Sequence, residues 1–153
     1  MITVTDNGAC NRASLSLFFG GIDMELIQTG LHEECGVFGV CDQSGGCAQT
    51  VYYGLYALQH RGQEACGIAA INNREQSFHK DAGLVSEVFS RDILDRLNGT
   101  MAVGHVRYAT TGAGGRENAQ PLTIKYVKGT LAVVHNGNLV GIDQLRRSFE
   151  YQG

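Results

Sequence analysis

From Cys35 onwards the chain alternates short apolar runs with stretches whose apolar residues recur at helical spacing. Gly36 to Val40 predicts a strand, and Val51, Leu55 and Leu58 then recur at i, i+4 and i+7 on one face of a helix. This alternation constrains the fold more than any other feature of the sequence. It predicts a domain that mixes strands with helices, and by itself it fits several such arrangements.

The same alternation continues to the end of the chain. Apolar runs predict three further strands, at Gly67 to Ile71, Met101 to Tyr108 and Thr130 to His135. Helical spacing predicts a second helix from Val85 to Leu97, which Asn98-Gly99 would end. A third helix is predicted by the apolar residues Ile142, Leu145 and Phe149.

Composition and charge narrow the class of protein. The 153 residues, 43% hydrophobic and 18% charged, are typical of one globular domain. A net charge of −3 without a Lys/Arg cluster argues against binding to nucleic acid. Five cysteines, an odd number, and no convincing export signal favour free thiols in a reducing, cytoplasmic setting. The apolar stretch Ala13 to Phe19 is too short to span a membrane, so we expect no membrane association.

Cys35 lies at the head of the first predicted strand, in Glu33-Glu-Cys-Gly-Val-Phe-Gly-Val40. An unpaired cysteine in an apolar strand is most often a small buried hydrophobe. If the peptide bond before Cys35 were cut, a thiol and a free α-amino group would belong to one residue. Reference pKa values are about 8.5 for a thiol and about 7.7–8.0 for an α-amine, so such an amine can take the thiol proton near neutral pH. The residue would be a nucleophile that carries its own base.

The residues before Cys35 are treated separately from the fold. We exclude residues 1–23, which are either an extra N-terminal extension or a misassigned start, with Met24 as the alternative first residue. Residues 24–34 would then be a short leader. Residues 1–34 together are therefore interpreted as a leader or propeptide.

Three polar clusters follow predicted helices or strands, where functional sites are often built. They are His60-Arg-Gly-Gln63, His105-Val-Arg-Tyr-Ala-Thr110 and His135-Asn-Gly-Asn138. Each has a structural alternative. Asn136-Gly137 is a hairpin-turn signal, Arg107 could be a surface arginine, and Arg61 could neutralise a helix C-terminus.

Together, the clusters supply what a thiol needs in order to cleave an amide. The side chain of Asn136 and the backbone N–H of Gly137 could donate hydrogen bonds to one oxyanion. Arg107 suits a bidentate grip on a carboxylate. The stretch Thr111 to Asn118 has three glycines and no apolar anchor. We therefore expect a mobile loop there, which would close over whatever the arginine binds.

Five motifs carry a resemblance to a known family. They are Cys35-Gly-Val-Phe-Gly39, Leu58-Gln-His-Arg-Gly-Gln-Glu64, Gly104-His-Val-Arg-Tyr-Ala-Thr-Thr-Gly112, Asn118-Ala-Gln-Pro121 and His135-Asn-Gly-Asn-Leu139. In this order they resemble the glutamine phosphoribosylpyrophosphate amidotransferases, or amidophosphoribosyltransferases, and the resemblance covers Glu33 to Gly153. The related glucosamine-6-phosphate synthases typically have Tyr-Arg-Gly-Tyr-Asp and Trp-Ala-Thr-His at the second and third motifs. The Glu33-Glu34-Cys35 leader resembles that of the propeptide-bearing subgroup.

The resemblance implies an α+β fold, the N-terminal-nucleophile (Ntn) hydrolase four-layer αββα sandwich, incomplete in this chain. Residues 1–34 would be the leader or propeptide, and residues 35–153 a partial class-II glutamine amidotransferase (glutaminase) domain. The family's phosphoribosyltransferase domain and the Asp that binds the α-amino group of glutamine are expected outside these residues. We therefore expect the chain alone to lack full glutaminase activity and any transferase activity.

The resemblance also implies the catalytic residues. Once the leader is removed, Cys35 would be the nucleophile and its own α-amine the base. Arg61 and Gly62 would position Cys35, and Gly62 would contact the substrate through its backbone. Asn136 and Gly137 would form the oxyanion hole.

The glutamine pocket is implied in the same way. Arg107 would bind the α-carboxylate of glutamine, and Tyr108 and Thr110 would line the pocket. Residues 107–121 would form the loop that closes over glutamine. The thiol would attack the side-chain amide, ammonia would leave, and water would hydrolyse the glutamyl thioester.

The complete enzyme implied by the resemblance catalyses the first step of purine (IMP) synthesis. Ammonia would displace pyrophosphate from phosphoribosylpyrophosphate to give 5-phosphoribosylamine. The segment itself would hold no cofactor, whereas Mg²⁺ and an iron–sulfur (4Fe-4S) cluster would belong to the full-length protein, a homo-oligomer (dimer or tetramer). Two alternatives stay open: the glutaminase domain of another class-II amidotransferase, and a non-catalytic module that keeps the fold.

Overall fold

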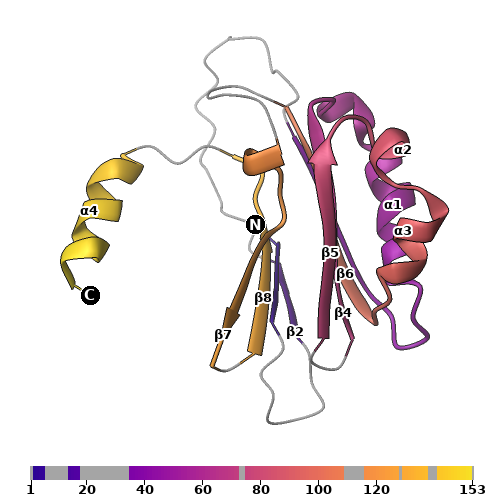
Figure 1. Ribbon diagram of the computed structural model, residues 1–153, viewed down its shortest axis with the longest axis horizontal. Helices are drawn as coiled ribbons and strands as arrows, with labels where there is room; N and C mark the ends of the chain where they lie inside the picture. The colour runs from indigo at the N-terminus through magenta and orange to yellow at the C-terminus, as the bar shows by residue number, and fades with distance from the viewer. Residues whose placement is uncertain are drawn as a thin grey trace.

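The computed structural model shows two antiparallel sheets packed face to face, with helices on the outer face of one of them (Figure 1). The structure describes residues 2–5, 14–17, 35–72, 75–108, 116–127, 129–137 and 141–152. We refer to the sheet that carries the helices as sheet B and to the other as sheet A. This arrangement agrees with the α+β class predicted from the sequence.

Sheet B brings three chain segments to one end of the sandwich. Its strand order is β3-β6-β4-β5, with β3 at Gly36–Cys41, β4 at Ala65–Asn72, β5 at Glu75–Ala82 and β6 at Met101–Arg107. Gly36 pairs with Val106, and Ala65 pairs with Arg107. The starts of β3 and β4 therefore lie beside the end of β6. Cys35 and the first two polar clusters are brought together at this end.

Helix α1 (Cys47–Ala57) packs on sheet B through the apolar face predicted from its spacing. Val51 and Leu55 on this face are fully buried. Beneath them lies Gly104, where an added Cβ would come within 2.6 Å of Val51 Cγ1 and 2.7 Å of Leu55 Cδ1. The close approach of the helix to β6 therefore requires glycine at this position.

The layer between the sheets is built from the opposite faces of their strands. Sheet B contributes Ala69, Ile71, Met101 and Val103, and sheet A contributes Ala132 and Val134. Side chains alternate along β6, so His105 and Arg107 lie on the same face as Met101 and Val103. The third polar cluster follows Val134 in sheet A. The packing of the two sheets thus carries this cluster toward the site end of sheet B.

Sheet A includes residues that we excluded from the fold on sequence grounds. Its order is β2-β1-β8-β7, with β1 at Ile2–Thr5, β2 at Ser14–Leu17, β7 at Leu122–Tyr126 and β8 at Gly129–Val134. The backbone of β1 pairs with β8, with Ile2 opposite Val134. An open edge of β8 would leave backbone N–H and C=O groups unpaired, and the alternating Ile-Thr-Val-Thr sequence suits a strand that satisfies them.

Most predicted elements are confirmed, one predicted helix is divided, and two further strands besides β1 and β2 were not predicted. The predicted helix over Val85–Leu97 is two short helices, α2 (Val85–Val88) and α3 (Arg91–Arg96). The hydroxyl of Ser90 accepts a hydrogen bond from the backbone N–H of Ile93 and so starts α3 anew. Strands β5 and β7 were not predicted. Strand β5 (Glu-Gln-Ser-Phe-His-Lys-Asp-Ala) has few apolar residues, whereas β7 (Leu-Thr-Ile-Lys-Tyr) carries a short apolar–polar alternation that was not recognised as a strand.

Helix α4 (Ile142–Gln152) forms where the third helix was predicted, but it lies apart from the two sheets (Figure 1). Its apolar residues Ile142, Leu145 and Phe149 are 44%, 52% and 63% exposed. On the outer side of sheet A, Leu122 and Ile124 are also half exposed. In the described residues, α4 therefore does not form a helical layer on sheet A.

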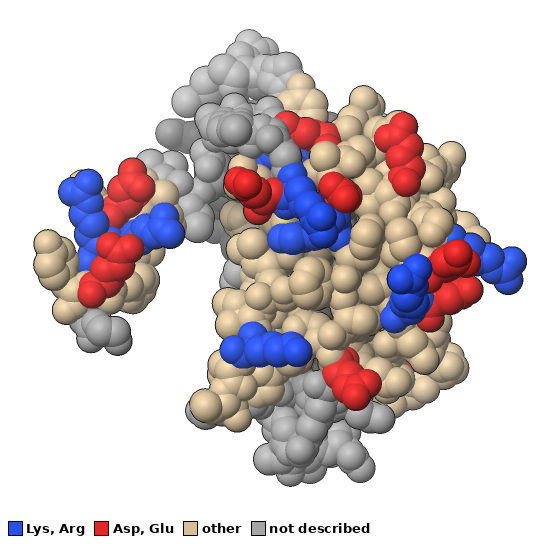
Figure 2. Space-filling model, in the orientation of Figure 1, with Lys and Arg blue, Asp and Glu red and all other residues tan. Residues whose placement is uncertain are grey.

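Charged side chains are mixed on the face of the molecule shown in Figure 2. Lys and Arg lie beside Asp and Glu there, within a broad uncharged surface. On α4, Arg146 and Glu150 form an ion pair one turn apart, with 3.6 Å between nitrogen and oxygen. Within the described ranges, no helix combines the length and the apolar character needed to cross a membrane.

Candidate active site

Cys35 lies immediately before β3, at the end of sheet B where the chain segments meet. Because Gly36 pairs with Val106, Cys35 falls opposite Arg107 in the register. Its thiol sits against the backbone of Tyr108, whose N–H donates to Sγ at 3.4 Å, with Sγ also 3.7 Å from the Tyr108 carbonyl oxygen. The side chain is partly exposed. The thiol is therefore held at the end of β6 and remains accessible.

Two predicted residues converge on the carbonyl oxygen of Cys35. Arg61 Nε donates to it at 2.8 Å, and Asn136 Nδ2 donates at 3.4 Å. Arg61 ends the short 3₁₀ helix η1 (Gln59–Arg61) on the sheet B side, whereas Asn136 follows β8 of sheet A. The site thus lies where the two sheets meet, and residues far apart in sequence hold one peptide group.

Gly62 allows the η1 segment to pack directly on the end of β6. It is buried, and an added Cβ would lie 2.6 Å from the carbonyl carbon of Arg107 and 2.8 Å from its backbone nitrogen. Real Cβ atoms do not approach the backbone so closely, so any other residue would push η1 away. Arg61 would then lose its hydrogen bond to the carbonyl oxygen of Cys35. Contact between Gly62 and a substrate stays a prediction.

Arg107 is fixed by a residue to which we assigned no role from the sequence. Its Nη1 donates to Glu64 Oε2 at 3.0 Å, and the two side chains are 12% and 29% exposed. The backbone N–H of Glu64 also donates to the Arg107 carbonyl oxygen at 3.1 Å. A guanidinium has five N–H donors in a planar fork. Glu64 binds the guanidinium at one nitrogen, on the partly buried side of the site, and binding of a carboxylate by Arg107 stays a prediction.

The predicted closing loop is only partly within the described residues. Tyr108, half exposed, is described, whereas Thr110 lies in the undescribed stretch 109–115. The far end of the loop is fixed: after η2 (Arg116–Asn118), Lys80 Nζ donates to the carbonyl oxygens of Ala119 at 2.6 Å and Pro121 at 3.2 Å. The roles of Tyr108 and Thr110 in binding glutamine stay predictions.

Comparison with known families decides the class of the chain. The sequence profile of the glutamine amidotransferases class-II matches residues 57–152. This chain belongs to that family. The match includes Arg61, Gly62, Arg107 and Asn136, the residues that surround the partly exposed Cys35 in the structure.

The relatives with similar sequences are amidophosphoribosyltransferases, which confirms the resemblance. The protein of Bacillus subtilis (strain 168) is 50% identical over 125 residues, which cover 81% of this chain and 26% of the relative. The protein of Methanocaldococcus jannaschii is 46% identical over 120 residues, which cover 78% of this chain and 26% of the relative. The Mycobacterium tuberculosis (strain H37Rv) protein is 47% identical over 138 residues, 90% of this chain and 25% of the relative. The chain thus spans about a quarter of the length of these relatives.

Solved structures confirm the predicted fold. One, described as the allosteric regulatory enzyme of purine biosynthesis, has a TM-score of 0.70 and 48% identity, covering 76% of this chain and 25% of that one. The other is glutamine phosphoribosylpyrophosphate amidotransferase from B. subtilis complexed with ADP and GMP. Its TM-score is 0.64 and its sequence identity is 44%, and the match covers 78% of this chain and 25% of that one. The fold class inferred from the motifs is therefore that of the class-II glutamine amidotransferases.

The environment of each thiol distinguishes Cys35 from the other described cysteines of this chain. Cys47 and Cys66 are fully buried, and burial raises the pKa of both thiols, that of Cys66 to about 12. Thiols of this kind are poor nucleophiles, because the thiolate is the reactive form. Cys41 is exposed at the other end of β3 from Cys35. Of the described thiols, Cys35 is the one that lies among the predicted site residues.

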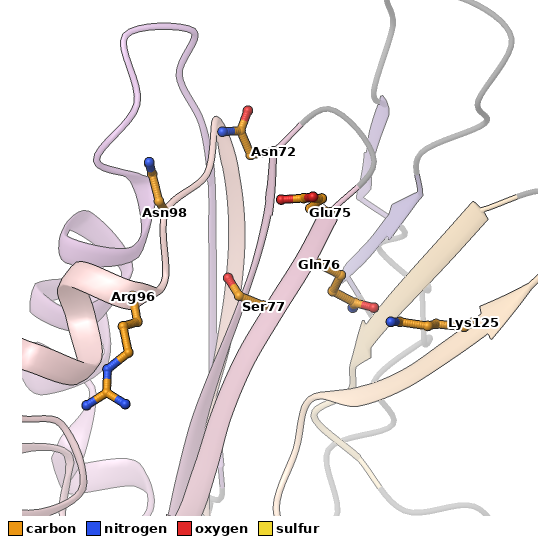
Figure 3. A pocket seen from close by; sticks show the side chains of 7 residues that line it. All are labelled: Asn72, Glu75, Gln76, Ser77, Arg96, Asn98 and Lys125. Carbon is orange, nitrogen blue, oxygen red and sulfur yellow. The ribbon is translucent and has the colours of Figure 1, made fainter.

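A separate hollow lies at the opposite end of the sandwich (Figure 3). It measures about 470 Å³ and is lined by Asn72, Glu75, Gln76, Ser77, Arg96, Asn98 and Lys125. Asn72 ends β4, whose first residue, Ala65, pairs with Arg107 at the site. A strand rises about 3.3 Å per residue, so this hollow lies roughly 20 Å from the thiol. It is not part of the amidotransferase site.

His105 is a fully buried histidine two residues before Arg107 on β6. Within the described residues, neither ring nitrogen makes a hydrogen bond of good geometry. Burial lowers the pKa of His105 to about 4, the charges of Arg107 and His135 add to the shift, and the nearby backbone of His135 opposes it in part. The imidazole is therefore neutral at pH 7.

The buried His105 predicts a loss of stability on acidification. Its pKa falls from 6.5 to about 4 on folding, so between these values the unfolded state binds a proton that the folded state does not. The free energy of unfolding should therefore fall as the pH drops below 6.5, by about 2 kcal/mol at pH 5 from this residue. Urea unfolding at pH 7.5 and pH 5 would measure it. The variant His105→Leu should reduce the difference in the free energy of unfolding between the two pH values, whereas His60→Gln, at an exposed histidine, should not. Equal differences in the unmodified protein and in both variants would contradict the prediction.

Proposed function

We propose that the chain is part of the glutaminase domain of an amidophosphoribosyltransferase. The full-length protein would take ammonia from glutamine and transfer it to phosphoribosylpyrophosphate. The observation that carries the proposal is the convergence of Arg61 and Asn136 on the carbonyl oxygen of Cys35, with Arg107 opposite Cys35 in the register. This geometry favours a catalytic domain over a non-catalytic module, because a module would not need these groups around an accessible thiol.

The proposed reaction begins with the thiol of Cys35 as the first residue of the mature protein. Its α-amine takes the thiol proton, and the sulfur attacks the side-chain amide carbon of glutamine. The tetrahedral intermediate collapses as the C–N bond breaks, and the proton passes from the α-amine to the departing nitrogen, which leaves as ammonia. Water then attacks the glutamyl thioester, releasing glutamate and restoring the thiol.

The surrounding residues have separable roles in this scheme. Asn136 Nδ2 and the backbone N–H of Gly137 donate to the oxyanion that forms on the amide oxygen. Arg107 binds the α-carboxylate of glutamine, with Tyr108 and Thr110 beside it. Arg61 holds the backbone of Cys35 in place. Groups that act on the oxyanion should control kcat, whereas the carboxylate anchor should control KM.

The backbone at Cys35 supports removal of the leader. Cys35 has φ of 56°, a left-handed conformation that is rare for residues other than glycine. This conformation costs about 1–2 kcal/mol for an L-residue. Once Cys35 is the first residue it has no φ angle and the cost disappears. Removal of residues 1–34 would also take β1 and β2 from the edge of β8.

The remaining parts of the proposal concern the full-length protein. Within the described residues, no group of three His, Cys, Asp or Glu side chains could hold a metal ion. We propose Mg²⁺ and an iron–sulfur cluster as cofactors of the full-length protein. A second domain would bind phosphoribosylpyrophosphate. We further propose a cytoplasmic homo-oligomer.

The proposal is tested with the full-length protein that carries this chain. With glutamine and phosphoribosylpyrophosphate as substrates, glutamate and pyrophosphate should form in equal amounts. Glutamate formation that depends on a different acceptor instead of phosphoribosylpyrophosphate would identify another class-II amidotransferase. A protein with Cys35 as its first residue that forms no glutamate with any acceptor would be a non-catalytic module.

A further inference from the structure

We propose that Gln120 is a positioning residue that fixes the oxyanion donors Asn136 and Gly137 relative to Cys35. The inference rests on the proposed function, since it assigns a role within that reaction. Gln120 touches neither Cys35 nor, in the proposed scheme, glutamine. Its effect is transmitted through the backbone of His135.

The register of sheet A explains why a side chain is needed at this point. Strands β7 and β8 pair from Tyr126 opposite Gly129 up to Leu122 opposite Val133. One step further, Pro121 has no N–H to donate, so the ladder cannot continue through its backbone. The step after that places Gln120 opposite His135. The backbone ladder therefore stops just before the residues that carry the oxyanion donors.

The side-chain carboxamide of Gln120 makes the hydrogen bonds to His135 that the backbone of β7 would otherwise make. Its Oε1 accepts from the His135 backbone N–H at 2.6 Å, and its Nε2 donates to the His135 carbonyl oxygen at 3.1 Å. This exchange of two hydrogen bonds is the pattern of a hydrogen-bonded pair in an antiparallel sheet. A side-chain amide has one acceptor and one donor side, so glutamine can pair with both backbone groups of one residue.

Gln120 is itself held firmly by sheet B. Lys80 on β5 binds the carbonyl oxygens of the residues on either side of it, Ala119 and Pro121. The backbone carbonyl of Gln120 lies so close to Gly67 that any Cβ there would clash with it. Since both contacts come from the sheet that also positions Cys35, Gln120 links the end of β8 to the frame that holds the nucleophile.

The two proposed oxyanion donors, Asn136 and Gly137, come directly after His135 in the chain. Asn136 Nδ2 reaches the Cys35 carbonyl oxygen at 3.4 Å. Gly137 has φ of 148° and lies against the His135 ring, where an added Cβ would come within 2.8 Å of Cε1. A shift of the His135 backbone would therefore move both donors. Misplacement of a catalytic group by about 1 Å can cost on the order of 10²-fold in rate.

The test uses the full-length protein and the variants Gln120→Glu and Gln120→Ala. Glu keeps the shape and the acceptor but loses the donor, while Ala loses both. Gln76 offers a matched control: its Nε2 also donates to a β8 carbonyl oxygen, that of Leu131, at 3.4 Å, but away from the site. For each protein, kcat and KM for glutamine hydrolysis are measured together with synthesis from free ammonia, which needs no thiol and reports on folding.

For both Gln120 variants, kcat for glutamine should fall by about 10–10²-fold with KM nearly unchanged. Synthesis from ammonia should persist, and Gln76→Glu should behave as the unmodified protein. An unchanged kcat, a rise in KM alone, or an equal loss of the ammonia reaction would overturn the inference and leave the proposed function intact. Absence of glutaminase activity in the unmodified protein would overturn both.

Discussion

Replacement of Cys35 by alanine is expected to abolish glutamate release from glutamine while synthesis from free ammonia continues. In the proposed reaction the thiol forms the covalent bond to the glutamyl group, and deletion of a nucleophile can lower kcat by roughly 10⁶-fold. In the proposed scheme the acceptor reaction does not use the thiol when ammonia is supplied. Steady-state assays of the full-length protein with glutamine, and separately with an ammonium salt, measure the two activities.

A matched control for this substitution lies on the same strand. Cys41→Ser changes an exposed thiol at the far end of β3 and should leave both activities unchanged. Glutamine-dependent activity that survives in Cys35→Ala would exclude Cys35 as the nucleophile. Loss of both activities in Cys35→Ala would point to misfolding, which thermal unfolding of the variant would detect.

Replacement of Asn136 by alanine should lower kcat for glutamine hydrolysis by about 10²–10³-fold, the usual cost of one oxyanion donor. KM should change little, because the amide oxygen needs this donor mainly when it becomes an oxyanion. Asn136→Asp tests the same point with no change in size, since a carboxylate cannot donate. Both variants require kcat and KM to be measured separately.

The opposite change in the two kinetic constants, KM instead of kcat, would contradict the role of Asn136 as an oxyanion donor. If Asn136→Ala raised KM with kcat unchanged, the side chain would bind ground-state glutamine. Its contact with the Cys35 carbonyl oxygen at 3.4 Å would then be structural. Arg107→Gln provides the comparison, because loss of the carboxylate anchor should mainly raise KM.

The fold could be predicted wherever local pattern and tertiary burial agree. Helix α1 presents Val51 and Leu55 to sheet B, and β3, β4 and β6 are continuous apolar runs. Strand β5 (Glu-Gln-Ser-Phe-His-Lys-Asp-Ala) is mostly polar and lacks this signal, and the short alternation in β7 (Leu-Thr-Ile-Lys-Tyr) was overlooked. The pairing of Ile2–Thr5 with β8 depends on which sheet edge is open. A local pattern carries no such information.

The candidate site could be predicted only where a side chain has a recognisable chemical type. Arg61 and Asn136 stood out as polar residues after structural elements, and the structure brings both to Cys35. Glu64 and Gln120 lay inside the motifs but received no role. Their partners are Arg107 and the backbone of His135, 43 and 15 residues away. Such contacts follow from the register of the strands, which the sequence pattern does not specify.

The central claim is that Cys35 acts as the first residue of the mature protein. Intact-mass measurement of the purified, active full-length protein tests this most directly, with N-terminal sequencing to locate the first residue. The proposed mechanism predicts a mass that lacks residues 1–34 and a sequence that begins Cys-Gly-Val-Phe-Gly. A fully active protein that still carries residues before Cys35 would contradict it, because the thiol would then have no α-amine to serve as its base.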